Sequence, residues 1–127
     1  MEIVFEKGIP GFEDIKEYEL EKLESNPIFY KLNAINEKNI GFVVISPFEI
    51  DDKYEIDIPQ NIVKELSINS PNEVMILNIL TLGQTIDKTT VNMKAPLIIN
   101  VNNGLGMQII LQSDKYEVKS PLLRSEE

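Results

Sequence analysis

Carboxylates are the only side chains in this sequence that are grouped closely enough to suggest acid/base chemistry. Asp51, Asp52, Glu55 and Asp57 fall within one short stretch. Paired carboxylates hydrolyse glycosidic bonds when one is kept protonated in an apolar pocket and the other stays ionised. In the segment YEIDI (54–58), however, the acids alternate with Tyr and Ile, so they are expected to face water. An Asp/Glu hydrolase is therefore a rival interpretation that the pattern disfavours.

The residue types that are missing exclude most other catalytic chemistry. The 127 residues include no His, Cys or Trp, which removes Ser-His-Asp and Cys-His nucleophiles, thiol redox chemistry and zinc sites built on Cys or His. Clustered acids also bind calcium, but FEIDDKYEID lacks the spacing of an EF-hand, which leaves only a weak site open. Gly104-Leu105-Gly106 precedes an apolar strand and not a helix, so it predicts a hairpin turn and no phosphate site. We expect no catalytic residue, no metal and no cofactor.

Acidic side chains outnumber basic ones by 21 to 12, which gives a net charge of -9 at pH 7. This charge disfavours nucleic acid, which is bound through clustered Lys and Arg, and favours a basic partner. Residues 1–60 hold 14 acidic and 6 basic side chains, against 7 and 6 in residues 61–127. Each acidic cluster is either a solvated face that aids solubility or a surface that steers a basic partner. The two clusters are Glu13, Asp14, Glu17, Glu19 and Glu21, and Glu49, Asp51, Asp52, Glu55 and Asp57.

The hydropathy pattern gives no sign of a membrane segment. No stretch approaches the roughly 20 apolar residues that span a bilayer, and the start MEIVFEKGIPGFE has neither a basic opening nor a long apolar run. We therefore expect a soluble, cytosolic protein without membrane contact, and the lack of cysteine fits a reducing compartment. The length suits one domain over residues 1–127.

Strand-forming residues dominate the apolar composition, because nineteen isoleucines and eight valines recur in short runs bounded by Gly, Pro, Asn and Asp. Many short strands with hardly any helix predict an all-β, mainly antiparallel fold, as a small single-domain barrel or sandwich. The runs predict strands at 2–5, 17–22, 28–34, 40–46, 54–58, 74–82, 90–92, 97–102, 106–112 and 115–119.

One short helix is predicted near 60–67, where Asn61 is a candidate N-cap and an apolar stripe follows it, formed by Ile62, Val63 and Leu66. A second helical turn at 13–16 is weakly indicated. Before it, the sequence Gly8-Ile9-Pro10-Gly11-Phe12 predicts a turn that pins Phe12 against the core.

The clearest predicted hairpin covers residues 97–112, with its turn at Asn103-Gly104. One face of this hairpin is wholly apolar, whereas the other carries amides and isoleucines. Such a face is easily desolvated yet still offers donors and acceptors, so it suits protein contact. The alternative is a ladder of amides that pair across the strands beneath another loop. The candidate contact residues are Ile98, Asn100, Gln108 and Ile110, with Asn92, Lys94 and Pro96 at their rim.

An ordered series of segments resembles the FliW family of flagellar assembly factors over essentially the whole chain. No single motif is diagnostic, but the order, the length and the acidic, histidine-free composition are together specific. The segments are Gly8 to Glu13 (GIPGFE), Phe42 to Ile45 (FVVI) with Pro47-Phe48, Tyr54 to Ile56 (YEI), Val91 to Asn100 (VNMKAPLIIN), and Gln108 to Leu111 (QIIL) with Tyr116.

The resemblance implies a small β-barrel fold and a non-enzymatic bacterial regulator. Proteins of this family bind flagellin and, when flagellin is depleted, bind the RNA-binding translational repressor CsrA, which relieves repression of flagellin mRNA. An acidic protein suits a basic repressor; the acids expected to attract it include Glu13, Asp14, Glu17, Asp51, Asp52, Glu55 and Asp57. The rivals are a sugar- or calcium-binding β-domain and another non-catalytic interaction module.

Overall fold

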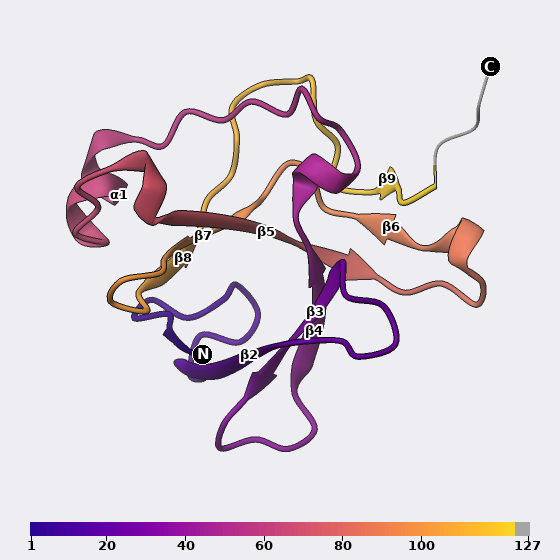
Figure 1. Ribbon diagram of the computed structural model, residues 1–127, viewed down its shortest axis with the longest axis horizontal. Coiled ribbons are helices and arrows are strands. Elements are labelled where there is room, and N and C mark those ends of the chain that lie inside the picture. Colours follow the sequence, from indigo (N-terminus) through magenta and orange to yellow (C-terminus); the bar gives the residue numbers. More distant parts are fainter. Residues whose placement is uncertain (124–127) are drawn as a thin grey trace.

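The computed structural model describes residues 1–123 and contains one mainly antiparallel sheet with a single short α-helix (Figure 1). The all-β prediction is confirmed. The strands are β1 (Glu2–Val4), β2 (Glu17–Lys22), β3 (Phe29–Ala34), β4 (Gly41–Ile45), β5 (Val74–Thr81), β6 (Thr90–Val91), β7 (Leu97–Asn100), β8 (Gly106–Gln108) and β9 (Ser120–Pro121). The helix is α1 (Gln60–Glu65), and the 3-10 turns are η1 (Pro47–Glu49), η2 (Pro71–Glu73) and η3 (Ile86–Lys88).

Strand β5 lies at the centre of the sheet because three strands pair with it. Its residues 74–77 pair with β7, 78–79 pair with β4 and 80–81 pair with β6. From β4 the sheet continues through β3 and β2 to β1, while β8 extends it beyond β7. Strand β1 comes back to the β7–β8 turn at one parallel bridge between Val4 and Leu105. The sheet is therefore strongly curled without being closed by a ladder, so the barrel prediction holds only loosely.

Both faces of β5 and β7 are covered, because side chains that alternate along a strand point to opposite faces. On one face Leu77, Leu97 and Ile99 pack with residues of β1 to β4, and we call this the closed side. Figure 1 shows β2, β3 and β4 folding across β5 from below. The buried members of the closed side are Ile3, Phe5, Ile9, Tyr18, Leu20, Leu32, Ala34, Val44, Leu77, Leu97 and Ile99.

The opposite face, which we call the groove side, is covered by α1 and by irregular chain on both sides of it. Ile98 of β7 is completely buried there. Within residues 1–123 no strand covers this face; Ile62 and Leu66 come from the helical segment, and Tyr54 and Tyr116 from extended chain. Its buried members are Ile45, Tyr54, Ile62, Leu66, Leu80, Val91, Met93, Ile98, Ile109, Leu111 and Tyr116.

The predicted turn around Gly8 is confirmed. The φ of Gly8 is 71°, and a Cβ on this residue would lie 2.5 Å from the Cα of Glu13, so only glycine fits. Phe12 then packs edge-on against Phe42, with 5.3 Å between the ring centroids. The following residues 13–16 form a turn and no helix.

Several predicted boundaries are wrong on the groove side. Residues 54–58 and 115–119 are not strands, and the predicted strand 106–112 ends at Gln108. The helix near 60–67 is confirmed at Gln60–Glu65, but its N-cap is Pro59 and not Asn61. In residues 1–123 no helix is long and apolar enough to cross a membrane.

Candidate protein-binding groove

A groove of about 1160 Å³ opens on the groove side, between the chain that precedes α1 and the chain that follows β8. One wall is the segment 54–59, which we call the acidic wall. The other is the segment 109–113, which we call the open wall. Half-buried aliphatic side chains from the helical segment and from β5 complete it, among them Val63, Ile68 and Ile76. The groove is thus largely apolar, yet it is open to solvent.

Buried hydrogen bonds hold the acidic wall in place. The Tyr54 hydroxyl donates to the carbonyl oxygen of Met93 (2.8 Å) and accepts from the Asn78 side-chain amide (3.5 Å), which also donates to the carbonyl oxygen of Asn92 (2.8 Å). The Tyr116 hydroxyl accepts from the backbone N–H of Glu55 (2.8 Å). Burial raises the pKa of Tyr54, so its hydroxyl remains a donor at neutral pH. The wall is therefore fixed by side chains and not by a strand ladder.

The open wall continues from the end of β8, and the N–H groups of two alternate residues in it donate hydrogen bonds to the chain behind. The N–H groups of Ile109 and Leu111 donate to the carbonyl oxygens of Pro96 (3.0 Å) and Lys94 (2.8 Å), which turns their side chains into the core. Ile110, between them, points outward and is 68% exposed. This alternation leaves an isoleucine at the mouth of the groove.

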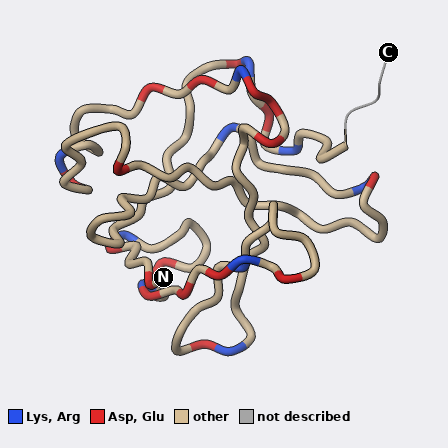
Figure 2. Tube along the Cα trace, in the orientation of Figure 1, with Lys and Arg blue, Asp and Glu red and all other residues tan. Residues whose placement is uncertain are grey.

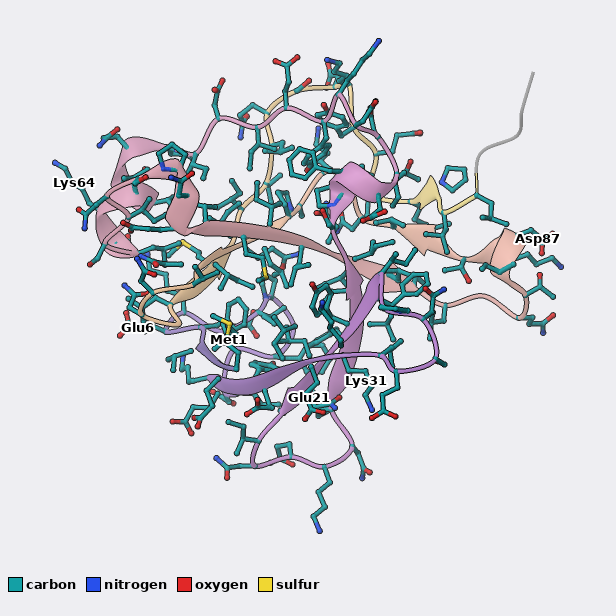
Figure 3. The ribbon with its side chains drawn as sticks, viewed as in Figure 1. Met1, Glu6, Glu21, Lys31, Lys64 and Asp87 are labelled. Atoms are coloured by element: carbon teal, nitrogen blue, oxygen red, sulfur yellow. The ribbon has the colours of Figure 1, made fainter. Side chains whose placement is uncertain are left out.

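The end of α1 is tied to the sheet by Asn100. Its side-chain amide nitrogen donates to the carbonyl oxygens of Leu66 (2.9 Å) and Ser67 (3.2 Å), which are free at a helix C-terminus. Its side-chain oxygen accepts from the N–H of Asn102 (2.9 Å). Figure 3 shows the opposite face of α1 turned to solvent, with Lys64 projecting outward. Asn100 is therefore a structural tie beneath the helix.

This arrangement corrects the predicted contact face of the 97–112 hairpin. Ile98 is 0% exposed and Asn100 is 1% exposed, so neither can meet a partner on the surface. The helical segment covers them. The alternative interpretation, in which the amides lie beneath other chain, is therefore correct in this respect. Of the four residues proposed for that face, Ile110 is exposed and Gln108 is half-buried, with its side-chain amide donating to the carbonyl oxygen of Ala95 (2.9 Å).

The predicted rim residues lie in a tight turn between β6 and β7. The Asn92 side-chain oxygen accepts from the N–H groups of Lys94 (3.2 Å) and Ala95 (3.0 Å). The Lys94 ammonium donates to the carbonyl oxygen of Ser113 (2.9 Å), and Pro96 is buried. All of these contacts have a structural purpose, because they brace the base of the open wall.

The two acidic clusters are separated in space. Figure 2 shows residues 49–57 along the upper edge of the molecule and residues 13–21 on the far side of β5, near the N-terminus. Asp52, Glu55 and Asp57 are exposed on or beside the acidic wall, whereas Asp51 is half-buried and accepts from the N–H of Lys53 (3.0 Å). The sequence contrast between the two halves of the chain therefore does not produce one acidic face.

The cluster at 13–21 lies beside the closed side, and none of its residues lines the groove between the two walls. Glu13, Asp14 and Glu17 are exposed. The backbone N–H of Gly11 donates to the Glu13 carboxylate (3.0 Å), and this bond lowers the pKa of Glu13. The charge of Glu13 is thus exposed to solvent.

The sequence interpretation missed the aliphatic residues that make the groove apolar. Ile56 and Ile58 alternate with the acids in the predicted strand 54–58, and both side chains are half-buried. A signal was present: Pro59 directly follows the alternating run, and proline favours the edge or the end of a strand. Nothing in the sequence reveals that the facing segment leaves a gap. The other missed lining residues are Phe48, Val63, Ile68, Val74 and Ile76.

The chemistry of the groove is that of recognition. It offers an apolar floor, one acidic rim and some main-chain groups that bond to no other backbone group of residues 1–123. In the same residues no cluster of carboxylates is arranged to hold a metal ion. The exposed Glu55 and the Lys115 ammonium are 3.9 Å apart, a surface pair of little energetic weight. Fold and groove together define a small, curled antiparallel β protein with a surface suited to a protein segment.

Comparison with known proteins gives the family. The family model described as FliW protein matches residues 1–122. The flagellar assembly factor FliW of Clostridioides difficile (strain 630) is 52% identical over 126 residues, which cover 99% of this chain and 97% of that protein. The flagellar assembly factor FliW of Clostridium botulinum (strain Okra / Type B1) is 44% identical over 124 residues, 98% of this chain and 87% of the relative.

A solved structure agrees with these relatives. The crystal structure of a flagellar assembly factor FliW superposes with a TM-score of 0.92 at 38% identity, covering 99% of this chain and 88% of that one. The chain therefore belongs to the FliW family of flagellar assembly factors. The resemblance drawn from the ordered sequence segments is confirmed.

Proposed function

We propose that this protein serves flagellar assembly by binding two proteins in turn. It binds flagellin and, when flagellin is depleted, it binds the translational regulator CsrA and relieves repression of flagellin mRNA. It works in the cytoplasm, catalyses no reaction and binds no nucleic acid directly. Membership of the FliW family supports this proposal. The observation that carries it is an apolar groove beside an exposed acidic wall.

The acidic wall fits the proposed basic partner. A protein that holds RNA must present positive charge, and complementary charge accelerates association and selects partners. Asp52, Glu55 and Asp57 are exposed next to apolar surface that can be desolvated on contact. Of the two clusters predicted to attract the regulator, this one is therefore favoured as the contact surface, while Glu13, Asp14 and Glu17 contribute only at long range.

The experiment is a titration of the purified protein into CsrA bound to a flagellin leader RNA, at two salt concentrations. We expect release of RNA, weaker at the higher salt because ions screen the attraction between exposed charges. Added flagellin should suppress the release by occupying the protein. Failure to bind either protein at both salt concentrations would overturn the proposed function.

Two matched triple variants test which acidic cluster matters. Asp52→Asn, Glu55→Gln and Asp57→Asn remove three charges on or beside the acidic wall, and Glu13→Gln, Asp14→Asn and Glu17→Gln remove three from the other cluster. We expect the first set to weaken capture of CsrA about tenfold at low salt and the second to change it much less. The reverse order would assign the regulator to the closed side.

A further inference from the structure

Part of the main chain on each wall of the groove makes no hydrogen bond to the described residues. On the acidic wall, the N–H and C=O groups of Ile56, Asp57 and Ile58 make no hydrogen bond to any of residues 1–123. On the open wall, the same holds for Ile110 and Gln112, whose neighbours bond to the chain behind them. Two extended segments thus present unpaired backbone groups beside one cavity, which is the condition for binding a peptide as an added strand.

The side chains of both walls alternate in the way that an added strand requires. On the acidic wall, Ile56 and Ile58 point inward and Asp57 outward; on the open wall, Leu111 is buried while Ile110 is exposed. A strand laid between them would place every second side chain on an apolar floor. The intervening side chains would lie on the outer face, beside the carboxylates of the acidic wall.

The charge and the size of the groove indicate what occupies it. Opposite charges that face each other across strands attract, so the exposed Glu55 and Asp57 select Lys or Arg at the outward positions of the guest. The volume of about 1160 Å³ exceeds the roughly 300–1000 Å³ of ordinary small-molecule sites. These features fit a peptide better than a small ligand.

We propose that the groove binds an extended segment of a basic protein partner by strand addition, with apolar side chains inward and basic side chains outward. The inference rests on the proposed function, because it assumes that a protein is captured. Main-chain hydrogen bonds supply affinity and the alternation supplies selectivity. The partner of positive charge, and not flagellin, is the occupant.

Hydrogen exchange of the intact protein tests this mode of binding, with CsrA and flagellin as separate probes. With CsrA bound, the amides of Ile110 and Gln112 should exchange more slowly, together with alternate amides of residues 56–58, since successive N–H groups of a strand point to opposite edges and only one edge faces the guest. The amides of the exposed turn η3 serve as an internal reference that should not change. If flagellin and not CsrA slowed exchange of these amides, the proposal that a basic protein occupies the groove would be wrong.

Proline removes one main-chain donor from the open wall. Ile110→Pro should weaken binding of CsrA by about tenfold, since it removes one N–H and blocks strand pairing. Ile110→Val keeps the N–H and should bind within about twofold of the parent. Ile86→Pro, at an isoleucine that is 56% exposed outside the groove, is the control for proline at the surface.

The outcomes separate the inference from the function on which it rests. CsrA that binds tightly without slowing exchange at either wall would overturn strand addition and leave the proposed function intact. Binding of neither protein would overturn both. If Ile110→Pro does not fold, the exchange measurement on the unaltered protein still decides the matter.

Discussion

The closed side and the groove side of β5 and β7 are built by different means. On the closed side, strands β1 to β4 bring apolar side chains into continuous contact with Leu97 and Ile99. On the groove side, irregular chain is held by hydrogen bonds between side chains and the backbone, from Tyr54, Asn78 and Asn100. The closed side supplies the apolar core of the curled sheet, whereas the polar ties keep two walls apart over a surface that stays accessible.

Two of the three buried tyrosines, Tyr54 and Tyr18, show this difference directly. The hydroxyl of Tyr54, on the groove side, has a donor and an acceptor. The hydroxyl of Tyr18, on the closed side, is buried without a hydrogen-bond partner in residues 1–123. A buried hydroxyl without a partner loses its hydrogen bonds to water and gains none in the protein. Of these two tyrosines, only Tyr54 therefore contributes to stability through hydrogen bonding.

The largest loss of stability is expected on the closed side. Leu97→Ala deletes a side chain that is 0% exposed and leaves a cavity, so the free energy of unfolding should fall by about 2–5 kcal/mol. Urea unfolding followed by circular dichroism measures it. Leu82→Ala, at a leucine that is 64% exposed, is the control and should change stability by less than about 0.5 kcal/mol. Equal effects would contradict the assignment of the core.

A smaller loss is expected from the tie beneath α1. Asn100→Ala removes the side-chain donor to the carbonyl oxygen of Ser67 and one of two side-chain donors to that of Leu66, the other being Asn103, which should cost about 1–3 kcal/mol. Exchange of the amides of α1 should quicken at the same time. Asn102→Ala, at an exposed asparagine whose side chain makes no such bond, is the matched control. Unchanged stability of the first variant would show that packing and the remaining bond from Asn103 hold the helix end without Asn100.

Asn100 shows what the sequence can and cannot predict: it predicts the face on which the residue lies, but not what covers that face. Period-two alternation correctly separates Leu97 and Ile99 from Ile98 and Asn100, which lie on the other face. It says nothing about whether a second layer covers that face. The residue type misleads as well, because an asparagine that caps a distant helix end looks the same in sequence as one that faces a partner.

The irregular segments of the groove side were hard to predict for a related reason. Residues 54–58 show the burial pattern of a strand, with Tyr54 buried and Glu55 exposed, but in the described part of the chain they pair with no strand. Pairing is a property of the whole chain and not of the segment. By contrast, strands β2, β3 and β4 follow one another through short connections, so local pattern and pairing agree.

The hydrogen bonds of Tyr54 can be removed with almost no change in shape. Tyr54→Phe leaves the carbonyl oxygen of Met93 and the Asn78 amide without the hydroxyl, so stability should fall by about 1–2 kcal/mol. Because the acidic wall is then held less firmly, capture of a partner should weaken as well. Tyr30→Phe is the control, since the Tyr30 hydroxyl makes no hydrogen bond within the described residues. Wild-type stability in Tyr54→Phe would mean that packing between Tyr54 and Tyr116 suffices.

The smallest effect at neutral pH is expected from Tyr18→Phe, because no hydrogen bond is lost. Stability at pH about 8 should stay the same or rise by up to about 1 kcal/mol. Burial raises the pKa of Tyr18 above its ordinary value of 10.0, so the unfolded chain ionises first as pH increases. Stability is therefore fully present below pH 10.0 and declines above it towards the higher pKa of the folded state. Urea unfolding above that pH should show a shallower decline for Tyr18→Phe than for the parent, and an equal decline would mean that Tyr18 does not contribute to alkaline unfolding.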